Sequence, residues 1–329
     1  MKSVKQILGL MLVAGVALTS CSKDPVLDVV QSDPQFEGPT AQEFKDIRDE
    51  ALQDLVQTAQ FNAEDGIVFT SSKGTVLSIS PGCLQLNGSS ATGAAELTFV
   101  EAYDKADMLT ANKATMGVMP SNDLGILVSG GEFYINVKQN GSQLDPGCGL
   151  SLVIPAGLTG GVDPDMKLWD GDMAADGTVV WEEDEGGANG QDNGVFGDGN
   201  EYYAYFDEFG WTNVDRFYND PRPKTTLQVK IPDGYDDANS AVYLSYDGEP
   251  NALAQLDTFD HTTSIFSEHY GQIPIGLEMH VIFVTEDDGE WKWGIKGVTV
   301  AANDLYVFTE SDLVTGTKAQ LVAAIQALP

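Results

Sequence analysis

The chain has 329 residues, and its 50 acidic side chains against 17 basic ones give a formal charge of −33. This charge argues against a nucleic-acid partner, because phosphate binding needs a cationic face. It also opposes direct adsorption to anionic lipid, so membrane attachment would have to come from a covalent lipid anchor. The length is enough for two domains.

Residues 1–20 have the composition of a signal peptide. Lys2 and Lys5 form a charged start, residues 7–18 are apolar, and small residues precede Cys21. The apolar segment is too short to span a bilayer, which takes ~20 residues. Leu18-Thr19-Ser20-Cys21 resembles the lipobox of bacterial lipoproteins, in which the cysteine is acylated, with palmitate for example, and becomes the new N-terminus. The alternative is an ordinary secretory signal followed by a chance cysteine.

The lipobox resemblance implies an exported protein moored at the outer membrane by acyl chains on Cys21, on the periplasmic face or at the cell surface. Ser22 follows the cysteine, whereas an aspartate there usually implies retention at the inner membrane of Gram-negative bacteria. Residues 21–39 are polar and contain prolines, so we expect a flexible tether.

Two further cysteines, Cys83 and Cys148, remain if Cys21 is lipidated. An exported compartment permits a disulfide between them. The sequence leaves this pairing open, because it does not show that the two residues lie close together.

Thr40-Ala41-Gln42-Glu43 forms a capping box, which predicts the start of a helix. Apolar residues then recur at helical spacing, namely Phe44, Ile47, Ala51, Leu55 and Ala59. We therefore expect an amphipathic helix over residues 40–60. Its apolar side should pack on a sheet, and the alternative is a helix that binds a partner.

Beyond this helix the apolar period changes to two, which is typical of strands. The expected strands cover residues 67–70, 75–79, 96–102, 132–138 and 150–154. In residues 132–138, Phe133, Ile135 and Val137 alternate with polar residues, so one face should be buried and the other wet, as in an antiparallel sandwich.

One turn and strand resemble a known family. Residues 74–82, followed by residues 96–99, look like the ZU5 domain, which runs a Gly-x-Leu-x-Ile-Pro-x-Gly-Ala turn into a strand of a β-sandwich. The resemblance covers about residues 66–154, and the chain departs from it with Ser80 and Cys83. It implies a module that contacts other proteins. The His-Phe-Ser site at which some members cut themselves does not occur in this sequence.

A Gly/Asp/Pro segment over residues 157–165 suggests a domain boundary, with a ZU5-like sandwich over 61–160 and a second β-domain over 161–329. Residues 166–182 suggest a hairpin, and residues 182–200 an acidic, glycine-rich mobile loop. Later strands are expected at 225–231, 241–246, 277–286, 290–295 and 297–300, before a short helix from Thr317. The predicted fold class is mostly β, with two antiparallel β-sandwich-like domains and a helix near each end.

Residues 210–217 read Gly-Trp-Thr-Asn-Val-Asp-Arg-Phe. The whole chain loosely resembles lipoproteins that combine a ZU5-like region with a Gly-Trp-x-Asn-x-Asp-Arg-Phe block, which supports the architecture and implies no activity. Asp215 and Arg216 could form a structural ion pair in this block.

Asp170, Asp172 and Asp176 could supply the oxygen ligands that calcium prefers. Their spacing does not fit an EF-hand loop. The alternative is an ordinary surface turn rich in Asp and Gly, so no metal is firmly predicted. His261, His269 and His280 lack the spacing of zinc ligands.

Catalytic motifs are missing from the sequence: it has no Gly-x-Ser-x-Gly elbow and no P-loop. A hydrolase with paired carboxylates stays open, because glycosidases need only two acids at the right separation. Among so many acids a candidate pair can always be found.

Trp211, Trp291 and Trp293 are the candidate glycan-stacking residues. Trp291 and Trp293 lie two apart on an expected strand, so their rings should share a face. Exposed rings could stack on sugars, and the alternative is that they form the core of a sandwich.

These observations lead us to expect a lipid-anchored, non-enzymatic binding or assembly module of the cell envelope, whose partner is another envelope protein or an extracellular glycan. The alternative is a hydrolase of surface polysaccharide. Tryptophans on an open face would favour a glycan, and buried tryptophans would favour a protein. A deep cleft with two facing carboxylates would favour the hydrolase.

Overall fold

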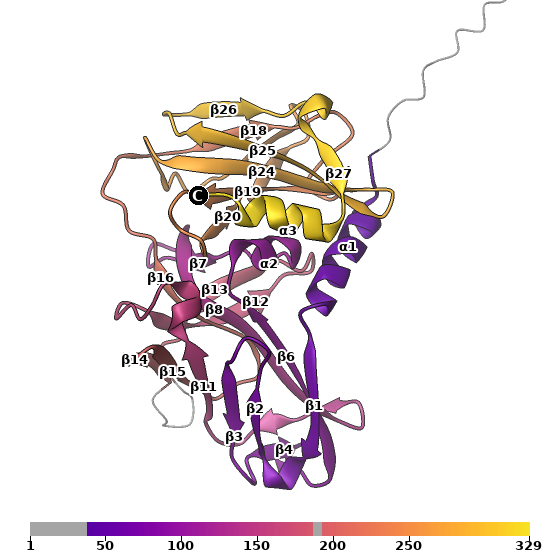
Figure 1. Cartoon of the computed structure of the whole chain (residues 1–329), viewed down its shortest axis with the longest axis vertical. Coiled ribbons are helices and arrows are strands. Elements are labelled where there is room, and N and C mark those ends of the chain that lie inside the picture. The colour runs from indigo at the N-terminus through magenta and orange to yellow at the C-terminus, as the bar shows by residue number, and fades with distance from the viewer. Residues whose placement is uncertain (1–37, 187–192) are drawn as a thin grey trace, which may run out of the picture. The chain divides into compact units, whose positions relative to one another are not determined.

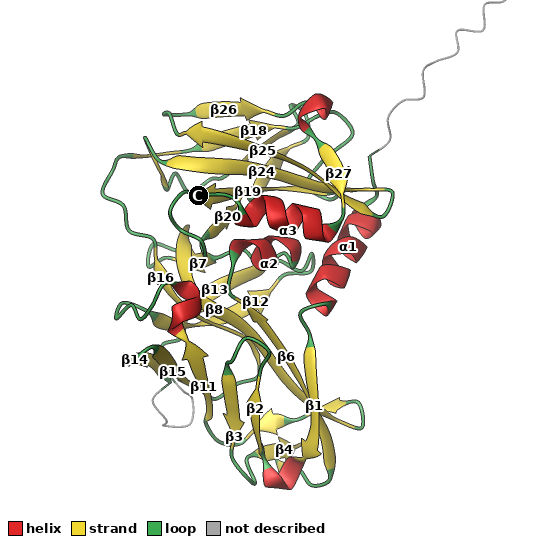
Figure 2. Cartoon of the chain, viewed as in Figure 1, coloured by secondary structure: helices red, strands yellow, loops and turns green. Residues whose placement is uncertain are grey.

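Strands make up 49% of the described chain and helices 13%. The structure, a computed structural model, describes residues 38–186 and 193–329, and within them the protein is mostly β with three α-helices (Figures 1 and 2). The helices are α1 (Ala41–Gln53), α2 (Lys105–Thr110) and α3 (Lys318–Gln326). The predicted mostly-β fold class is confirmed. The predicted signal peptide, Cys21 and nearly all of the predicted tether lie outside the described residues.

Two sheets form a sandwich. Sheet I contains, in spatial order, β1 (Gln57–Asn62), β6 (Ala94–Ala102), β8 (Leu124–Gln139), β16 (Gly210–Phe217), β12 (Lys167–Met173), β13 (Val179–Glu183) and β7 (Met116–Val118), with β9 (Ser142–Gln143) beside β8. Sheet II contains β14 (Gly194–Asp198), β15 (Glu201–Phe206), β11 (Leu150–Pro155), β3 (Val76–Ile79) and β2 (Ile67–Thr70). The same part of the sequence also forms a short separate sheet, which contains β10 (Asp145–Pro146), β4 (Leu84–Leu86) and β5 (Ser89–Ser90).

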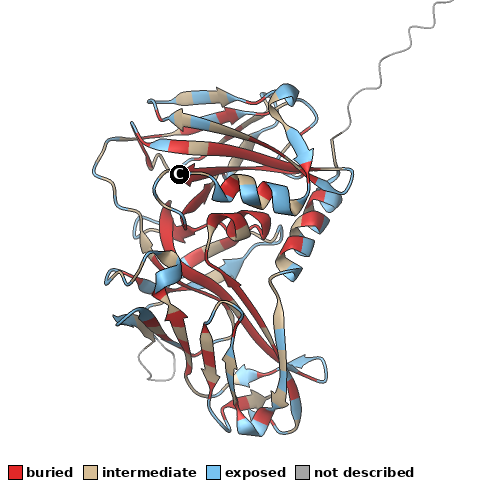
Figure 3. Ribbon diagram, in the orientation of Figure 1, coloured by how far each residue is buried: buried red, intermediate tan, exposed pale blue. Residues whose placement is uncertain are grey.

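The core of this sandwich consists of the inward residues of both sheets. Phe99, Phe133 and Ile135 come from sheet I, and Leu152 and Tyr202 come from sheet II. Each lies on the buried side of a strand whose next residue points the other way, so the alternation in the sequence becomes the packing of the core. In Figure 3 the buried residues, coloured red, are concentrated on the strands in the middle of the view.

A second pair of sheets is built from the C-terminal part of the chain. Sheet III contains β20 (Leu253–Gln255), β19 (Ser240–Tyr246), β24 (Glu278–Asp287), β25 (Glu290–Thr299) and β27 (Val314–Gly316). Sheet IV contains β21 (Thr258–Asp260), β22 (Ile265–Ser267), β18 (Leu227–Lys230) and β26 (Asp304–Val307), and β17 (Lys224–Thr225) pairs with β23 (Ile273–Pro274). Most pairings are antiparallel as expected, but β18 and β26 run parallel, as do β7 and β13 at a single pair of residues.

The predicted boundary at 160/161 falls inside the first sandwich. Strands from both sides of it pair in sheet I, where β16 lies beside β8, and in sheet II, where β15 lies beside β11. The Gly-rich segment forms a turn that returns the chain to the same sandwich, and the Tyr202 hydroxyl donates to the Gly161 carbonyl there (3.0 Å). The chain passes to the second pair of sheets between β16 and β17, where Pro221 and Pro223 interrupt the strands.

Helix α1 begins as predicted and ends earlier. Thr40 and Glu43 form the reciprocal capping box, and Phe44, Ile47 and Ala51 are buried. The Phe44 ring meets the Trp291 ring edge-on, with centroids 6.5 Å apart, so the helix packs against sheet III. The prediction that it reaches residue 60 is wrong, because residues 57–62 form β1 and pair with β6.

Two expectations about polar segments are corrected. The supposedly wet face of residues 132–138 is largely buried, since Glu132 is 0% and Asn136 6% exposed. Part of the predicted mobile loop over 182–200 is strand β14, which pairs with β15 through the two-residue turn Gly199-Asn200. Residues 187–192 of that loop lie outside the described residues.

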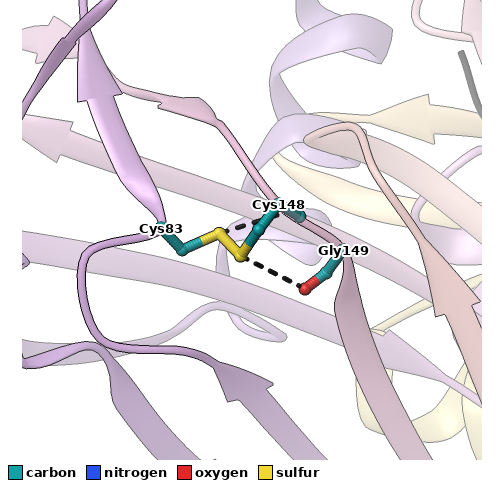
Figure 4. Close-up of a disulfide and its surroundings, with 3 residues drawn as sticks. All are labelled: Cys83, Cys148 and Gly149. Atoms are coloured by element: carbon teal, nitrogen blue, oxygen red, sulfur yellow. Dashed lines mark hydrogen bonds between the residues drawn. A yellow bond between two sulfur atoms is a disulfide. The ribbon is translucent and has the colours of Figure 1, made fainter. Parts of the chain in front are cut away.

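Cys83 and Cys148 form a disulfide, with their Cα atoms 5.3 Å apart (Figure 4). The bond joins the turn between β3 and β4 to the residue pair that leads into β11, across a sequence separation of 65 residues. It therefore fastens two segments of the first sandwich that the sequence left unpaired.

Candidate functional site

The three tryptophans proposed for glycan stacking lie in the protein interior. Trp211 and Trp293 are each 7% exposed and Trp291 is 2% exposed. Trp291 and Trp293 belong to the core beneath α1, and Trp211 packs with Trp181 on the far face of sheet I. The glycan-stacking prediction for these residues is wrong. The Phe44 ring of α1 meets the Trp291 ring, and Lys113, in the loop after α2, lies over the Trp211 ring.

A buried polar network runs along the pairing of β8 and β16. The register of these strands shifts between Asn213 and Asp215, where Gly130 and Gly131 of β8 lie opposite the single residue Val214 of β16 in a β-bulge. The Ser129 hydroxyl donates to Asn213 Oδ1 (3.1 Å), and Asn213 Nδ2 donates to Asp215 Oδ2 (2.5 Å). Asn251 Nδ2 donates to the Ser129 carbonyl. The β-bulge therefore lies next to a cluster of hydrogen-bonded polar residues.

Asp215, which belongs to this network, and Glu132, which lies beside it, are carboxylates with no exposed surface. Glu132 and Asp215 are each 0% exposed, and both oxygens of Glu132 and Oδ1 of Asp215 lack a hydrogen-bond partner within the described residues. Burial raises the pKa of Glu132 well above its ordinary value, and the charge of Asp215 raises it further while Lys113 opposes the shift. Burial also raises the pKa of Asp215, against hydrogen bonds from Ser129, Asn213 and Gly130.

This pair of acids is what a carboxylate hydrolase would need in chemical terms, but no substrate can touch it. A glycosidase places its two acids on either side of a bond in an open cleft. Here the acids lie inside sheet I, so they are candidates for a structural role.

The residues of the Gly-Trp-x-Asn-x-Asp-Arg-Phe block have different roles in the structure. Trp211 and Phe217 pack on the far face of sheet I, and Asn213 and Asp215 belong to the polar network. Arg216 Nε donates to Asp163 Oδ2 (2.6 Å), so the predicted ion pair between Asp215 and Arg216 is wrong. Adjacent strand residues point to opposite faces, which keeps the Arg216 side chain away from that of Asp215.

The three aspartates proposed for calcium do not come together. Asp170 and Asp172 lie on β12, whereas Asp176 lies in the turn after it and accepts hydrogen bonds from the backbone and hydroxyl of Thr178. Burial raises the pKa of Asp170 to about 6, and the charges of Asp184, Glu208, Asp207 and Asp172 raise it in the same direction.

Among the described residues, one group of three has metal-ligating atoms within 4.8 Å of one another: Asp236, Asp237 and His261. The side chains of His261 and Asp237 are 68% and 50% exposed, and Asp236 Oδ1 already accepts from the backbone of Ala238 and Asn239. His269 and His280 each bond an aspartate instead, Asp257 and Asp247. The histidines thus lie in three separate pairs.

A cavity of about 550 Å³ opens between α1, the β12–β13 turn and β20. Its size is within the range of small-molecule sites. Lys45 and Arg48 face it from α1, and Asp176, Asp237 and Asp257 face it from other segments. Because charges of both signs line the walls, the cavity favours no single class of ligand.

The outer face of sheet II is the exposed face that sequence reasoning missed. Strand pairing places Phe196, Tyr203, Val153, Val76 and Thr70 in one row across the sheet, and Gly194, Tyr205, Ser151, Ser78 and Val68 in the next. None of these residues is charged. Val68 is 73%, Phe196 53% and Tyr205 43% exposed, so apolar and aromatic side chains meet solvent in both rows.

The aromatic residues of this face pack against one another. The Phe196 ring lies nearly parallel to the rings of Tyr203 and Tyr205, with centroids 5.2 Å and 6.0 Å away. The signal that could have found Phe196 is the Asp198-Gly199-Asn200 turn, which follows Val195-Phe196 and precedes an alternating strand.

No helix in residues 38–186 or 193–329 is long and apolar enough to cross a bilayer. In the structure, the residues that resemble the ZU5 motif form the turn at Gly74, strand β3 and part of β6. No protein-family model matches the chain, and no curated protein matches it.

Proposed function

We propose that this chain is a lipid-anchored, non-enzymatic binding module of the cell envelope, which holds another envelope protein on the outer face of sheet II. The lipobox-like sequence ending at Cys21 supports the anchor and the location at the outer membrane. The observation that carries the binding role is the uncharged, aromatic outer face on a chain with a net charge of −33.

An exposed apolar face of this kind is typical of a surface that another protein covers. Burying a Phe or Val side chain gains about 1.5–3 kcal/mol, and aromatic residues often dominate such contacts. Phe196 and Tyr205 are therefore the expected centre of the interface. Carboxylates stand at one end of the face, where Asp198 pairs with Glu201 across the hairpin.

A protein suits this face better than a glycan. Sugar rings stack on free aromatic faces, but the Phe196 ring lies against Tyr203 and Tyr205 and shares its faces with them. The burial of Trp211, Trp291 and Trp293 removes the larger rings that would favour a glycan.

Photo-crosslinking in intact cells tests the proposal. A photoreactive residue at position 205 should give a discrete protein adduct, and the same residue at position 305 should not. Leu305 is the matched control, because it is 44% exposed against 43% for Tyr205 and lies on sheet IV. Tyr205→Ser should weaken capture of the cross-linked partner about tenfold or more, whereas Leu305→Ser should leave it unchanged.

Equal adducts from positions 205 and 305, or none from either, would contradict the proposal. A glycan array supplies the other arm of the test. Binding to a glycan that is lost in Tyr203→Ser would replace the protein partner with a sugar.

A further inference from the structure

Strand β2 forms an open edge of sheet II. It pairs with β3 on one side, and within the described residues no strand pairs with it on the other side (Figure 1). Sheet II therefore ends in backbone groups that no neighbouring strand uses. This edge adjoins the uncharged outer face, because Thr70 and Val68 are the last residues of its two rows.

The register of the β2–β3 hairpin shows which backbone groups are free. The Ser71 N–H donates to the Thr75 carbonyl (2.8 Å), so these two residues are a hydrogen-bonded pair. Hydrogen-bonded and non-hydrogen-bonded pairs alternate along an antiparallel ladder, so Phe69 bonds to β3 whereas Val68 and Thr70 do not. The N–H and C=O groups of Val68 and Thr70 therefore point to the open edge, and in the described chain no hydrogen bond outside the ladders involves them.

The edge also lacks the charges and prolines that usually discourage strand pairing. Residues 67–70 read Ile-Val-Phe-Thr, and Val68 is 73% exposed. Strand β26, an edge of sheet IV, differs, because the Lys296 ammonium donates to the Val307 carbonyl there (2.6 Å). An edge with free backbone groups and no such protection is open to a strand of another chain.

The charges at the two ends of β2 indicate what kind of strand fits. Glu64 and Asp65 lie in the turn before β2 and are exposed, and neither forms an ion pair within the described residues. At the other end, Lys73 is already paired with Asp107 (2.7 Å). A lysine or arginine beside Glu64 and Asp65 would complement their charge. The net charge of −33 opposes pairing with a second copy of this chain.

We propose that the partner of sheet II donates an extended segment, which pairs with β2 as an additional strand. This inference rests on the proposed function and names the class of partner. The segment has uncharged residues at the alternate positions that lengthen the two rows, and a lysine or arginine at the end beside Glu64 and Asp65. Its backbone bonds to the free groups of Val68 and Thr70, which supply affinity, while the alternate side chains supply specificity.

A proline at the open edge tests the pairing in intact cells, with the photoreactive residue at position 205. Val68→Pro should reduce the adduct about tenfold or more, because it removes a free N–H and its ring meets the added strand. Proline is tolerated where the N–H faces away from the ladder, so the hairpin should still form.

Thr58→Pro is the matched control. Thr58 is an exposed residue of β1, an edge of sheet I, and the hydrogen bond from the Ala63 N–H to the Gly93 carbonyl (2.9 Å) sets the same alternation there. The N–H of Thr58 therefore also faces away from its neighbouring strand. This variant should leave the adduct at position 205 unchanged.

Hydrogen exchange in the purified adduct decides the question if Val68→Pro fails to fold. The Val68 and Thr70 amides should exchange at least about tenfold more slowly in the adduct than in the free chain. The Phe69 amide, which bonds to β3, should be slow in both.

The inference is overturned, and the proposed function stands, if Val68→Pro keeps the full adduct or if the Val68 and Thr70 amides exchange equally fast in the adduct and the free chain. An adduct that consists of two copies of this chain also overturns it. The absence of any adduct from the unchanged chain overturns both the inference and the proposed function.

Discussion

At the scale of single residues, Glu132 is the clearest case of burial opposing charge. Its pKa is raised because it is buried and lies near Asp215. The folded chain therefore holds this proton more tightly than the unfolded chain. The resulting stabilisation is complete below pH ~4.5, the pKa of an ordinary glutamate, and is lost as the pH rises through the folded pKa.

Glu132→Gln keeps the shape of the side chain and has no proton to lose. We expect this variant to be more stable than the unchanged chain at pH 8 by about 1 kcal/mol or more, and close to it at pH 4. Urea unfolding at both pH values measures the difference. Glu278→Gln on β24 is the control, because Glu278 is exposed, and it should follow the unchanged chain. If Glu132→Gln also follows it, Glu132 does not carry this pH dependence.

At the scale of elements, the Cys83–Cys148 disulfide fastens the start of β4 to the start of β11. Closing a loop of this length in the unfolded chain is worth about 4 kcal/mol in the chain-entropy model. Cys83→Ala/Cys148→Ala should lower the free energy of unfolding by about that amount in urea. A reductant should lower the stability of the unchanged chain to the same level and leave the variant as it is. A loss below about 1 kcal/mol would contradict the entropic account.

The elements themselves were largely predictable from local patterns. The period of two gave β2 its observed ends, and the capping box gave the start of α1. Pairing was not predictable, because it depends on residues far apart in the chain. β1 pairs with β6 and so ends the helix pattern early, and Glu132 is buried because it pairs with Ala102 of β6 on one side and Asn213 of β16 on the other, inside sheet I.

For the candidate sites, too, local patterns identified residues but could not predict how those residues are placed in the folded chain. The sequence marked Trp211 and Asp215 as unusual, but neither spacing nor composition could show that they point into the interior. Phe196 escaped notice because acidic and glycine residues surround it, although it lies at the centre of the exposed aromatic cluster. A side chain's solvent exposure is a property of the assembled sheets, and local sequence carries little of it.

At the scale of the whole molecule, one core draws on both halves of the described chain. Met108 and Leu109 of α2 pack in the same cluster as Val242 and Phe283 of sheet III. Residues 37–329 accordingly form one compact unit, although they contain several separate sheets. Because the two pairs of sheets share this core, unfolding of either pair would expose apolar surface on the other.

We therefore expect residues 38–329 to unfold in a single transition. The calorimetric and van't Hoff enthalpies should agree, and circular dichroism and tryptophan fluorescence should give the same midpoint. Leu109→Ala removes a fully buried side chain from the shared core and should lower the free energy of unfolding by about 2–5 kcal/mol while keeping one transition. Leu158→Ala, at a residue 48% exposed, should change it by less than about 0.5 kcal/mol. Two transitions, with only one shifted by Leu109→Ala, would show instead that the two pairs of sheets unfold separately.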